Sequence, residues 1–536
     1  MFSSSHFNVS NNKVKRVSPK FNIFFMNTTS QKIINNKISS FLLVLLFLTL
    51  PFEKVLTFEM VGFTVKPPYI AGIFLICYFL YSLVTRRIKI SFKNYDYAAA
   101  LFIILSYATF FWSIDRIKTL VISSMFLFVY LIFLSVRSFI GCHSGLACPE
   151  RGRRDPESRN NNTILDPRVQ ACLPAGRPED DKGEAADDKR LYQDNKSGIN
   201  FYLNIFVWLG VVCSFFALFQ FFGDSYGLSQ QLTGLSNLYT KSVFGFPRVQ
   251  STFFEPGFFA SFLLIALFMN LLRLNSRNFY YYLSFIVLCV AFILTLSRGG
   301  FYSFLIAYVV AVVLIFVKRK DKMILIYRSM ELIVASITLA LFSVWLVAGP
   351  QGLYTFFGQS RNTQDLIAGS SQESVQNFTR NATIKIALQN WQKNIFGIGT
   401  GTFGSLPELQ ETRALGNERQ TVNSLYPEIL VEGGIQSLLA FLAFLTLLLW
   451  SLLAPILSSQ TPSALRIEPK DPQKDFSAPD KSPRGVEMTQ DGVVGSIIFS
   501  AAMLAIFIQY LSFSTLYLVY IWVFLGLIAA HSDSRK

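Results

Sequence analysis

Arginine and glutamate residues recur just outside the long apolar stretches of this sequence. Arg298 stands between two apolar runs in the string ILTLSRGGFYSF, and Arg248 and Glu255 share the string FPRVQSTFFEPGFF, just before another run. The planar guanidinium presents a fork of donors that matches phosphate oxygens, and such contacts are stronger beside a low-dielectric membrane. A nearby carboxylate could accept a proton from an attacking hydroxyl. These residues predict a site for a phosphate or diphosphate group at one membrane surface.

A long polar segment, residues 350–433, holds further groups of the same kind. Its arginines are Arg361, Arg380, Arg413 and Arg419. It also contains the run GIGTGTFG (397–404), whose backbone N–H groups could bind a phosphate, although isolated glycine-rich runs are more often turns. The stretch TRNATIKIALQNWQKN before it predicts a helix. Long ordered loops tend to carry function, so we expect this segment to belong to the site.

Each of these residues also has a purely structural interpretation. Arg298 could be an interfacial arginine whose charged head reaches water from a helix end. Glu255 followed by Pro256 is a good helix start, with an acid near the positive end of the dipole and proline in the first turn. The functional interpretation gains weight because all these groups are expected on one face.

The composition decides the class of protein that must position these residues. Hydrophobic residues make up 52% and charged residues only 15%, with a positive mean hydropathy over 536 residues, which excludes a soluble chain. We therefore expect an all-α polytopic membrane protein with about twelve transmembrane helices. The predicted spans lie near residues 38–52, 67–84, 97–114, 119–136, 199–223, 256–272, 279–297, 299–317, 330–349, 434–457, 493–513 and 515–531.

The placement of lysine and arginine predicts the orientation. Translocation disfavours basic residues in short flanking loops, and most of them fall on one side if the N-terminus is cytoplasmic. Both termini are then cytoplasmic, and the net charge of +15 is mostly a topology signal that does not require a nucleic-acid partner. We expect the first apolar run to be a signal anchor rather than a cleaved signal peptide.

These predictions divide the chain into membrane and non-membrane segments. The six cysteines show neither a disulfide framework nor a zinc-binding spacing, and no metal-ligand cluster or nucleotide-binding loop is evident, so no metal and no cofactor is expected. The segments are a cytoplasmic basic tail (1–37), four spans (38–136), a disordered cytoplasmic insertion (137–198), five spans (199–349), a periplasmic loop subdomain (350–433), one span (434–457), a cytoplasmic linker (458–492) and two spans (493–531).

Three strings in the second half of the chain resemble the successive motifs of one family. LTLSRGGFYSF, RNATIKIALQNWQKNIFGIGTGTFG and NSLYPEILVEGGIQSLLAFLAFL are similar, in order and spacing, to motifs of the bacterial O-antigen ligase and O-antigen polymerase superfamily. The resemblance covers roughly residues 200–530. It implies a multispanning glycosyltransferase of the bacterial inner membrane with a large periplasmic loop. Its implied donor is a glycan carried by undecaprenyl diphosphate, and its implied acceptor another glycan or lipid A-core, with membrane lipids around it.

The resemblance also assigns residues. Arg298 matches the arginine that ends the family's conserved span, and Glu432 and Gly434 match the acid and glycine that open the next span, as structural residues near the site. The glycines that match the family's turn are Gly397, Gly399 and Gly401. The His-Asn pair typical of ligases falls on Asn423 and Ser424, so its histidine is missing. The chain contains only His6, His143 and His531, and none is predicted on the outer face.

The missing histidine changes the expected mechanism. Transfer from a diphosphate-linked sugar needs a base for the acceptor hydroxyl and stabilisation of the leaving group. We expect Glu255 to be the base, with Glu432 or arginine electrostatics alone as alternatives, and Asn423 to orient the acceptor. The residues expected to bind the diphosphate are Arg248, Arg298, Arg380, Gly397, Gly399 and Gly401.

The missing histidine also bears on which member of the superfamily this is. Together with the Glu-Pro-Gly element it favours a polymerase-like enzyme over a ligase that joins glycan to lipid A-core. A transporter of polysaccharide or lipid remains an alternative, as does a non-catalytic scaffold. The span centres are almost free of charge and no internal repeat is evident, which argues against transport.

Overall fold

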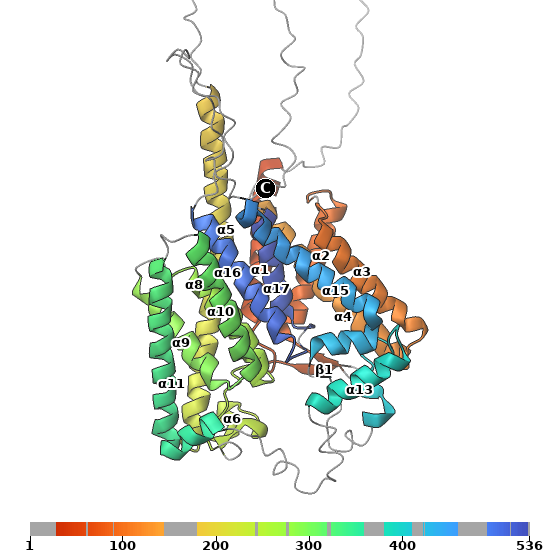
Figure 1. Ribbon diagram of the computed structural model, residues 1–536. Helices are drawn as coiled ribbons and strands as arrows, with labels where there is room; N and C mark the ends of the chain where they lie inside the picture. Colours follow the sequence, from red (N-terminus) through yellow and green to blue (C-terminus); the bar gives the residue numbers. More distant parts are fainter. Residues whose placement is uncertain are drawn as a thin grey trace, which may run out of the picture.

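The protein is an all-α polytopic membrane protein (Figure 1). The computed structural model describes residues 28–60, 63–88, 90–143, 180–241, 245–274, 278–318, 323–358, 380–409, 422, 424–458, 490–514 and 516–533. The α-helices are α1 (Thr28–Thr49), α2 (Pro67–Val84), α3 (Asn94–Ala108), α4 (Arg116–His143), α5 (Asp180–Ser225), α6 (Gln230–Thr233), α8 (Pro256–Leu271), α9 (Phe279–Leu294), α10 (Arg298–Lys318), α11 (Met323–Gly358), α13 (Arg380–Lys393), α15 (Leu425–Ser458), α16 (Gln490–Gln509) and α17 (Val519–Asp533).

Short elements lie between some of these helices. An antiparallel hairpin of β1 (Phe58–Met60) and β2 (Phe63–Val65) links α1 to α2, and the sequence analysis did not predict it. The 3-10 turns are η1 (Thr109–Phe111), η5 (Asn237–Tyr239), η8 (Phe403–Ser405) and η9 (Pro407–Leu409). In Figure 1 the hairpin, α6 and α13 all lie at the lower end of the helical bundle.

Each predicted span overlaps a helix. Among the described residues, seven helices are long and apolar enough to cross a membrane, and four shorter apolar helices accompany them. Helices α8 and α9 have 16 residues each and α17 has 15, below the roughly 20 residues that cross a bilayer without help. The count of about twelve spans therefore stays a prediction.

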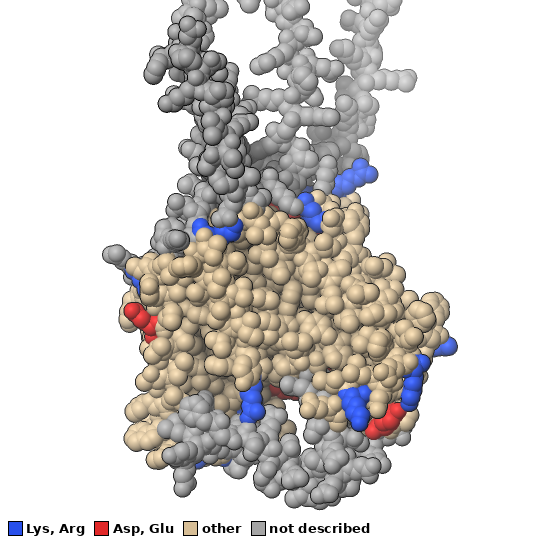
Figure 2. Space-filling view, viewed as in Figure 1, with Lys and Arg blue, Asp and Glu red and all other residues tan. Residues whose placement is uncertain are grey.

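The surface carries the signature of a membrane protein. Figure 2 shows Lys, Arg, Asp and Glu side chains gathered mostly toward the two ends of the molecule, with a broad, nearly uncharged band between them. Large apolar side chains such as Phe342, Trp345 and Leu346 of α11 are exposed in the structure. Lipid chains would cover these side chains, so their exposure needs no protein partner.

The middle of the bundle is packed with aromatic rings from sequence-distant helices. Phe133 of α4, Phe444 of α15 and Trp522 of α17 form one group, in which the Phe444 and Trp522 rings stack 5.8 Å apart. Gly526 lets α17 approach α4 closely, since a Cβ there would lie 3.0 Å from the carbonyl oxygen of Phe133. This packing holds the C-terminal helix against the N-terminal half of the chain.

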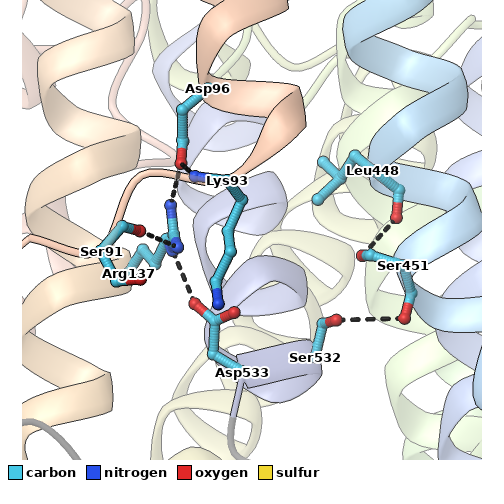
Figure 3. Close-up of polar contacts among 8 residues, drawn as sticks. All are labelled: Ser91, Lys93, Asp96, Arg137, Leu448, Ser451, Ser532 and Asp533. Carbon is cyan, nitrogen blue, oxygen red and sulfur yellow. Dashed lines mark hydrogen bonds and ion pairs between the residues drawn. The ribbon is translucent and has the colours of Figure 1, made fainter. Parts of the chain in front are cut away.

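A buried ion cluster joins three helices at one end of the bundle (Figure 3). The Arg137 guanidinium, 6% exposed, donates from Nη1 to Asp96 Oδ2 over 2.6 Å and from Nε to Asp533 Oδ2 over 2.7 Å. Its Nη2 donates to the carbonyl oxygen of Ser91. All three nitrogens are therefore partnered, which offsets the cost of burying the charge.

This cluster corrects the predicted boundary of the insertion. Residues 137–198 were expected to be disordered, but α4 continues to His143 and α5 begins at Asp180. The sequence analysis missed that a charged arginine at the end of an apolar run can pair with acids of other helices. Residues 144–179 lie outside the described part of the chain.

Candidate functional site

The starts of three helices meet one loop at the opposite end of the bundle from the ion cluster. The N–H of Leu425, at the start of α15, donates to the carbonyl oxygen of Tyr510, where the loop between α16 and α17 begins. A Cβ on Gly257 of α8 would collide with the Phe513 ring of this loop, and one on Gly299 of α10 would collide with Ser512. The loop (residues 510–518) therefore fixes the starts of α8, α10 and α15 together. Figure 2 shows this end hollowed between the parts that carry α6 and α13.

Glu255 occupies the position before the first residue of α8. Pro256 follows in the first turn, and the Glu255 carbonyl accepts from the N–H of Phe259, so the predicted helix start is confirmed. The carboxylate, however, makes no capping hydrogen bond and is exposed. The exposed acid is placed where a ligand could reach it.

Arg298 is the first residue of α10 and is also exposed. The start of a helix carries partial positive charge, so a cation there costs about 0.3–1 kcal/mol rather than stabilising the helix. Just before it, Leu296 takes a φ of 52°, an uncommon conformation for this residue type. The helix dipole therefore does not favour a cation at this position, and the exposed side chain can be reached from outside the helix.

Arg248 has a structural role that the sequence analysis did not predict. Only 7% of it is exposed, and its Nε and Nη2 both donate to the carbonyl oxygen of Thr295, over 3.3 and 3.2 Å. Its guanidinium also lies 5.6 Å from the centre of the Tyr239 ring. Arg248 therefore fastens its loop to the turn before Arg298, and its predicted contact with a diphosphate stays a prediction.

Gln220, inside α5, holds the same loop from the membrane side. Its Oε1 accepts from the N–H groups of Gln250 and Ser251, and its Nε2 donates to the carbonyl oxygens of Thr233 and Ser251. Ser251 takes a φ of 54°, so the loop is strained and tightly determined. The sequence analysis missed Gln220, although a lone glutamine within an apolar span is a signal for such a role.

The three predicted glycines form a turn against α15. The N–H of Gly397 donates to Asn394 O, that of Gly399 to Glu432 O, and that of Gly401 to Glu432 Oε2 over 2.7 Å. All three N–H groups therefore have acceptors within the protein. These bonds hold the turn against α15, and the predicted phosphate contact of the three glycines stays a prediction.

Glu432 and Gly434 receive this turn. The second carboxylate oxygen of Glu432 accepts from the N–H of Phe403, so both oxygens bind backbone N–H groups, and the side chain is buried. Gly434 takes a φ of 76° and interrupts α15, while a Cβ on Gly397 would collide with the Glu432 carbonyl. Because its lone pairs are engaged, Glu432 suits a structural role better than that of a base.

A small satellite core surrounds the glycine turn. The predicted helix over residues 379–394 is present as α13, and the hydroxyl of Thr383 donates to the carbonyl oxygen of Val422. The buried residues of this core are Ala387, Ile398, Phe403, Leu406, Leu409, Val422 and Val431. Arg380 begins α13, but its side chain is not described, and Arg361, Arg413, Arg419 and Asn423 lie outside the described residues.

Four residues that the sequence analysis did not single out lie near Glu255. Glu53 and Lys66 come from the α1–α2 segment, Glu428 from the first turn of α15 and Tyr517 from the α16–α17 loop. The Glu428 carboxyl group forms a hydrogen bond with the Ser514 side chain. Glu53 and Glu428 each have one carboxyl oxygen that is buried without a hydrogen-bond partner. Burial raises the pKa of Tyr517, and the charges of Glu428, Glu255 and Glu53 raise it further. The charges of all three acids therefore act on Tyr517.

Fold and site together define a membrane-embedded protein in which an exposed acid, Glu255, and an exposed arginine, Arg298, lie at helix starts at one end of the bundle. A family model described as O-Antigen ligase matches residues 283–442, from within α9 to within α15. This segment is therefore similar to the O-antigen ligase family, and the match supports a membrane protein of the ligase and polymerase type that acts in surface polysaccharide synthesis. A search of curated proteins found no match. Within the described ranges, no group of three or more His, Cys, Asp or Glu residues could hold a metal ion.

Proposed function

We propose that this protein is a polymerase-like glycosyltransferase that uses an undecaprenyl-diphosphate-linked glycan as donor. The observation that carries the proposal is the placement of Glu255 and Arg298 at neighbouring helix starts, on either side of the contacts with Ser512 and Phe513. The orientation predicted from lysine and arginine puts this end at the periplasmic face of the bacterial inner membrane.

The proposed reaction assigns one task to each charged group. The acceptor hydroxyl attacks C1 of the donor's first sugar, and the bond from C1 to the diphosphate oxygen breaks. Glu255 takes the hydroxyl proton, and undecaprenyl diphosphate leaves with the bonding electrons. Arg298 and the starts of α8 and α10 stabilise the charge that develops on the leaving diphosphate.

The other residues of the site act through these two. Arg248 and Gln220 fix the loop that carries Glu255, and the Gly397–Gly401 turn with Glu432 fixes the start of α15. Asn423, one residue before α15's flanking Ser424, would orient the acceptor, and Arg380 would add positive charge to the donor site. Both assignments rest on sequence position.

The histidines support a carboxylate as base. His143 ends α4 and His531 lies near the end of α17, whereas the site lies where α8 and α10 start and where α16 ends. His531 packs against Phe499, with ring centres 4.6 Å apart. Among the described residues the site thus contains no histidine, which favours a polymerase-like enzyme over a ligase that uses one.

The surface polysaccharide of a strain that lacks this gene tests the proposal. Loss of the long-chain ladder, leaving a single repeat unit, would support a polymerase. Intact polymer retained on its lipid carrier would instead favour the second candidate, a ligase to lipid A-core, which the description of the matched family supports. A profile identical to that of the complemented strain would contradict both.

A further inference from the structure

Glu53 and Lys66 lie far from the matched family segment in the sequence but beside Glu255 in space. The hydroxyl of Thr252 donates to the carbonyl oxygen of Pro51 over 2.6 Å, and the N–H of Lys54 donates to the carbonyl oxygen of Thr252. The Lys54 ammonium also donates to the carbonyl oxygen of Gly234. These bonds fasten the loop that follows α1 to the loop that ends at Glu255.

Lys66 reaches the same place from the start of α2. Its Nζ lies 4.7 Å from the centre of the Phe254 ring and 5.9 Å from that of Tyr69. A cation over an aromatic face is held in place by the ring's quadrupole. Lys66 therefore brings a positive charge next to the residue that precedes Glu255.

Glu53 is enclosed by these elements. It is 3% exposed, and one of its carboxylate oxygens is buried without a hydrogen-bond partner. The charged and titratable groups that act on it or that it acts on are Lys66 from the start of α2, Glu255 before α8, Tyr517 of the α16–α17 loop and Tyr520 of α17. The buried carboxyl group of Glu53 thus lies close enough to the exposed Glu255 for their charges to interact, with Lys66 as the only lysine among these groups.

We propose that Glu53 and Lys66 complete the donor site, and that Glu53 is a positioning residue that must be neutral for the diphosphate to bind beside Glu255. This inference rests on the proposed function. An ionised Glu53 would add a second negative charge next to Glu255 and repel the diphosphate. A neutral Glu53 removes that repulsion and can donate a hydrogen bond.

The electrostatics of the region agree with this role. Burial raises the pKa of Glu53 to about 7, with the negative charge of Glu255 adding to the rise and Lys66 opposing it. Below neutral pH Glu53 is then mostly protonated. Above neutral pH Glu53 ionises, so donor affinity is expected to fall as pH rises.

Binding of undecaprenyl diphosphate to the full-length protein in lipid nanodiscs tests the inference. Between about pH 6 and about pH 8.5, Kd of the wild type should rise about tenfold more than Kd of Glu53→Gln, because glutamine keeps the neutral form. The ligand's own ionisation affects both proteins equally. Glu408→Gln is the matched control, since Glu408 is an exposed glutamate of η9 at the same end, and it should behave as the wild type.

A second variant keeps the test decisive if Glu53→Gln folds poorly. Lys66→Met removes the cation that lowers the pKa of Glu53, so the rise in Kd should move to higher pH. If Kd depended on pH in the same way in the wild type, Glu53→Gln and Lys66→Met, the inference would be overturned, and the proposed function would be unaffected. Failure of the wild type to bind undecaprenyl diphosphate at any pH would overturn the proposed function as well.

Discussion

Arg137 and Arg298 both lie near the ends of apolar helices, yet the protein treats their charges in opposite ways. Arg137 is buried, and its guanidinium is fully engaged by Asp96, Asp533 and Ser91. Arg298 is exposed at a helix start, where the dipole disfavours a cation. A charge that is buried among its partners fixes the fold, whereas a charge at an exposed helix start can be reached by a substrate.

The glutamates repeat this contrast. Glu432 gives both oxygens to backbone N–H groups and locks a turn, whereas Glu255 stands before α8 without capping it. Structural and chemical roles are therefore separated by partner and position rather than by residue type. Replacing one member of each pair should affect either folding or turnover, but not both.

The largest effect is expected from Glu255→Gln. Loss of the general base should lower the rate of glycan transfer by about 10²–10⁴-fold while the protein remains folded. The rate is measured from the time course of lipid-linked glycan lengthening by purified enzyme. Glu408→Gln is the control, and equal rates for the two variants would remove Glu255 from the mechanism.

Arg298→Ala should have the second-largest effect on the rate of glycan transfer. Removing one preorganised donor to the leaving group should reduce the rate about 10²–10³-fold, and lysine should restore only part because it lacks the planar fork. Arg116 supplies a matched control, as an exposed arginine that begins α4 at the same end of the bundle. Similar losses in Arg116→Ala would mean that the effect is a general one of surface charge.

Arg137→Ala should give the opposite result. Breaking a buried ion pair leaves Asp96 unpaired and costs about 3–5 kcal/mol, so the unfolding temperature in detergent should drop. Activity per folded molecule should stay close to that of the wild type. A stable but inactive Arg137→Ala protein would contradict the assignment of a structural role to Arg137 and a chemical role to Arg298.

A smaller effect is expected from Gly397→Ala. An added Cβ would collide with the Glu432 carbonyl at a φ of 88°, whereas Gly227 has a φ of 83° with no atom within 4 Å of its Cβ position. Gly227→Ala should therefore cost only the left-handed penalty of about 1–2 kcal/mol, and Gly397→Ala more. Thermal unfolding of both variants measures the difference, and equal losses would show that the close packing of the turn contributes little.

Much of the fold follows from the sequence because apolar runs in a membrane protein have few alternatives. All the predicted spans overlap helices, and the helix over residues 379–394 was found by its pattern. The boundary at Arg137 was wrong because its partners, Asp96 and Asp533, are remote in sequence. The β1–β2 hairpin was missed since three-residue strands carry too short a pattern.

The site was less predictable, for a physical reason. Sequence position placed Glu255 and Arg298 near helix starts, but which acceptors the Gly401 N–H and the Arg248 guanidinium would meet depends on packing between distant segments. Glu53 reaches the site only because its loop bonds to Thr252, some two hundred residues away. Such a contact cannot be predicted from the spacing of residues in the sequence.

The most direct test of the account supplies the purified protein in nanodiscs with lipid-linked repeat units alone, without lipid A-core. The account predicts longer lipid-linked glycans together with released undecaprenyl diphosphate, and their loss in Glu255→Gln and Arg298→Ala. Folded wild-type protein that lengthens no glycan under these conditions, or variants that lengthen it as fast as the wild type, would contradict the central claim.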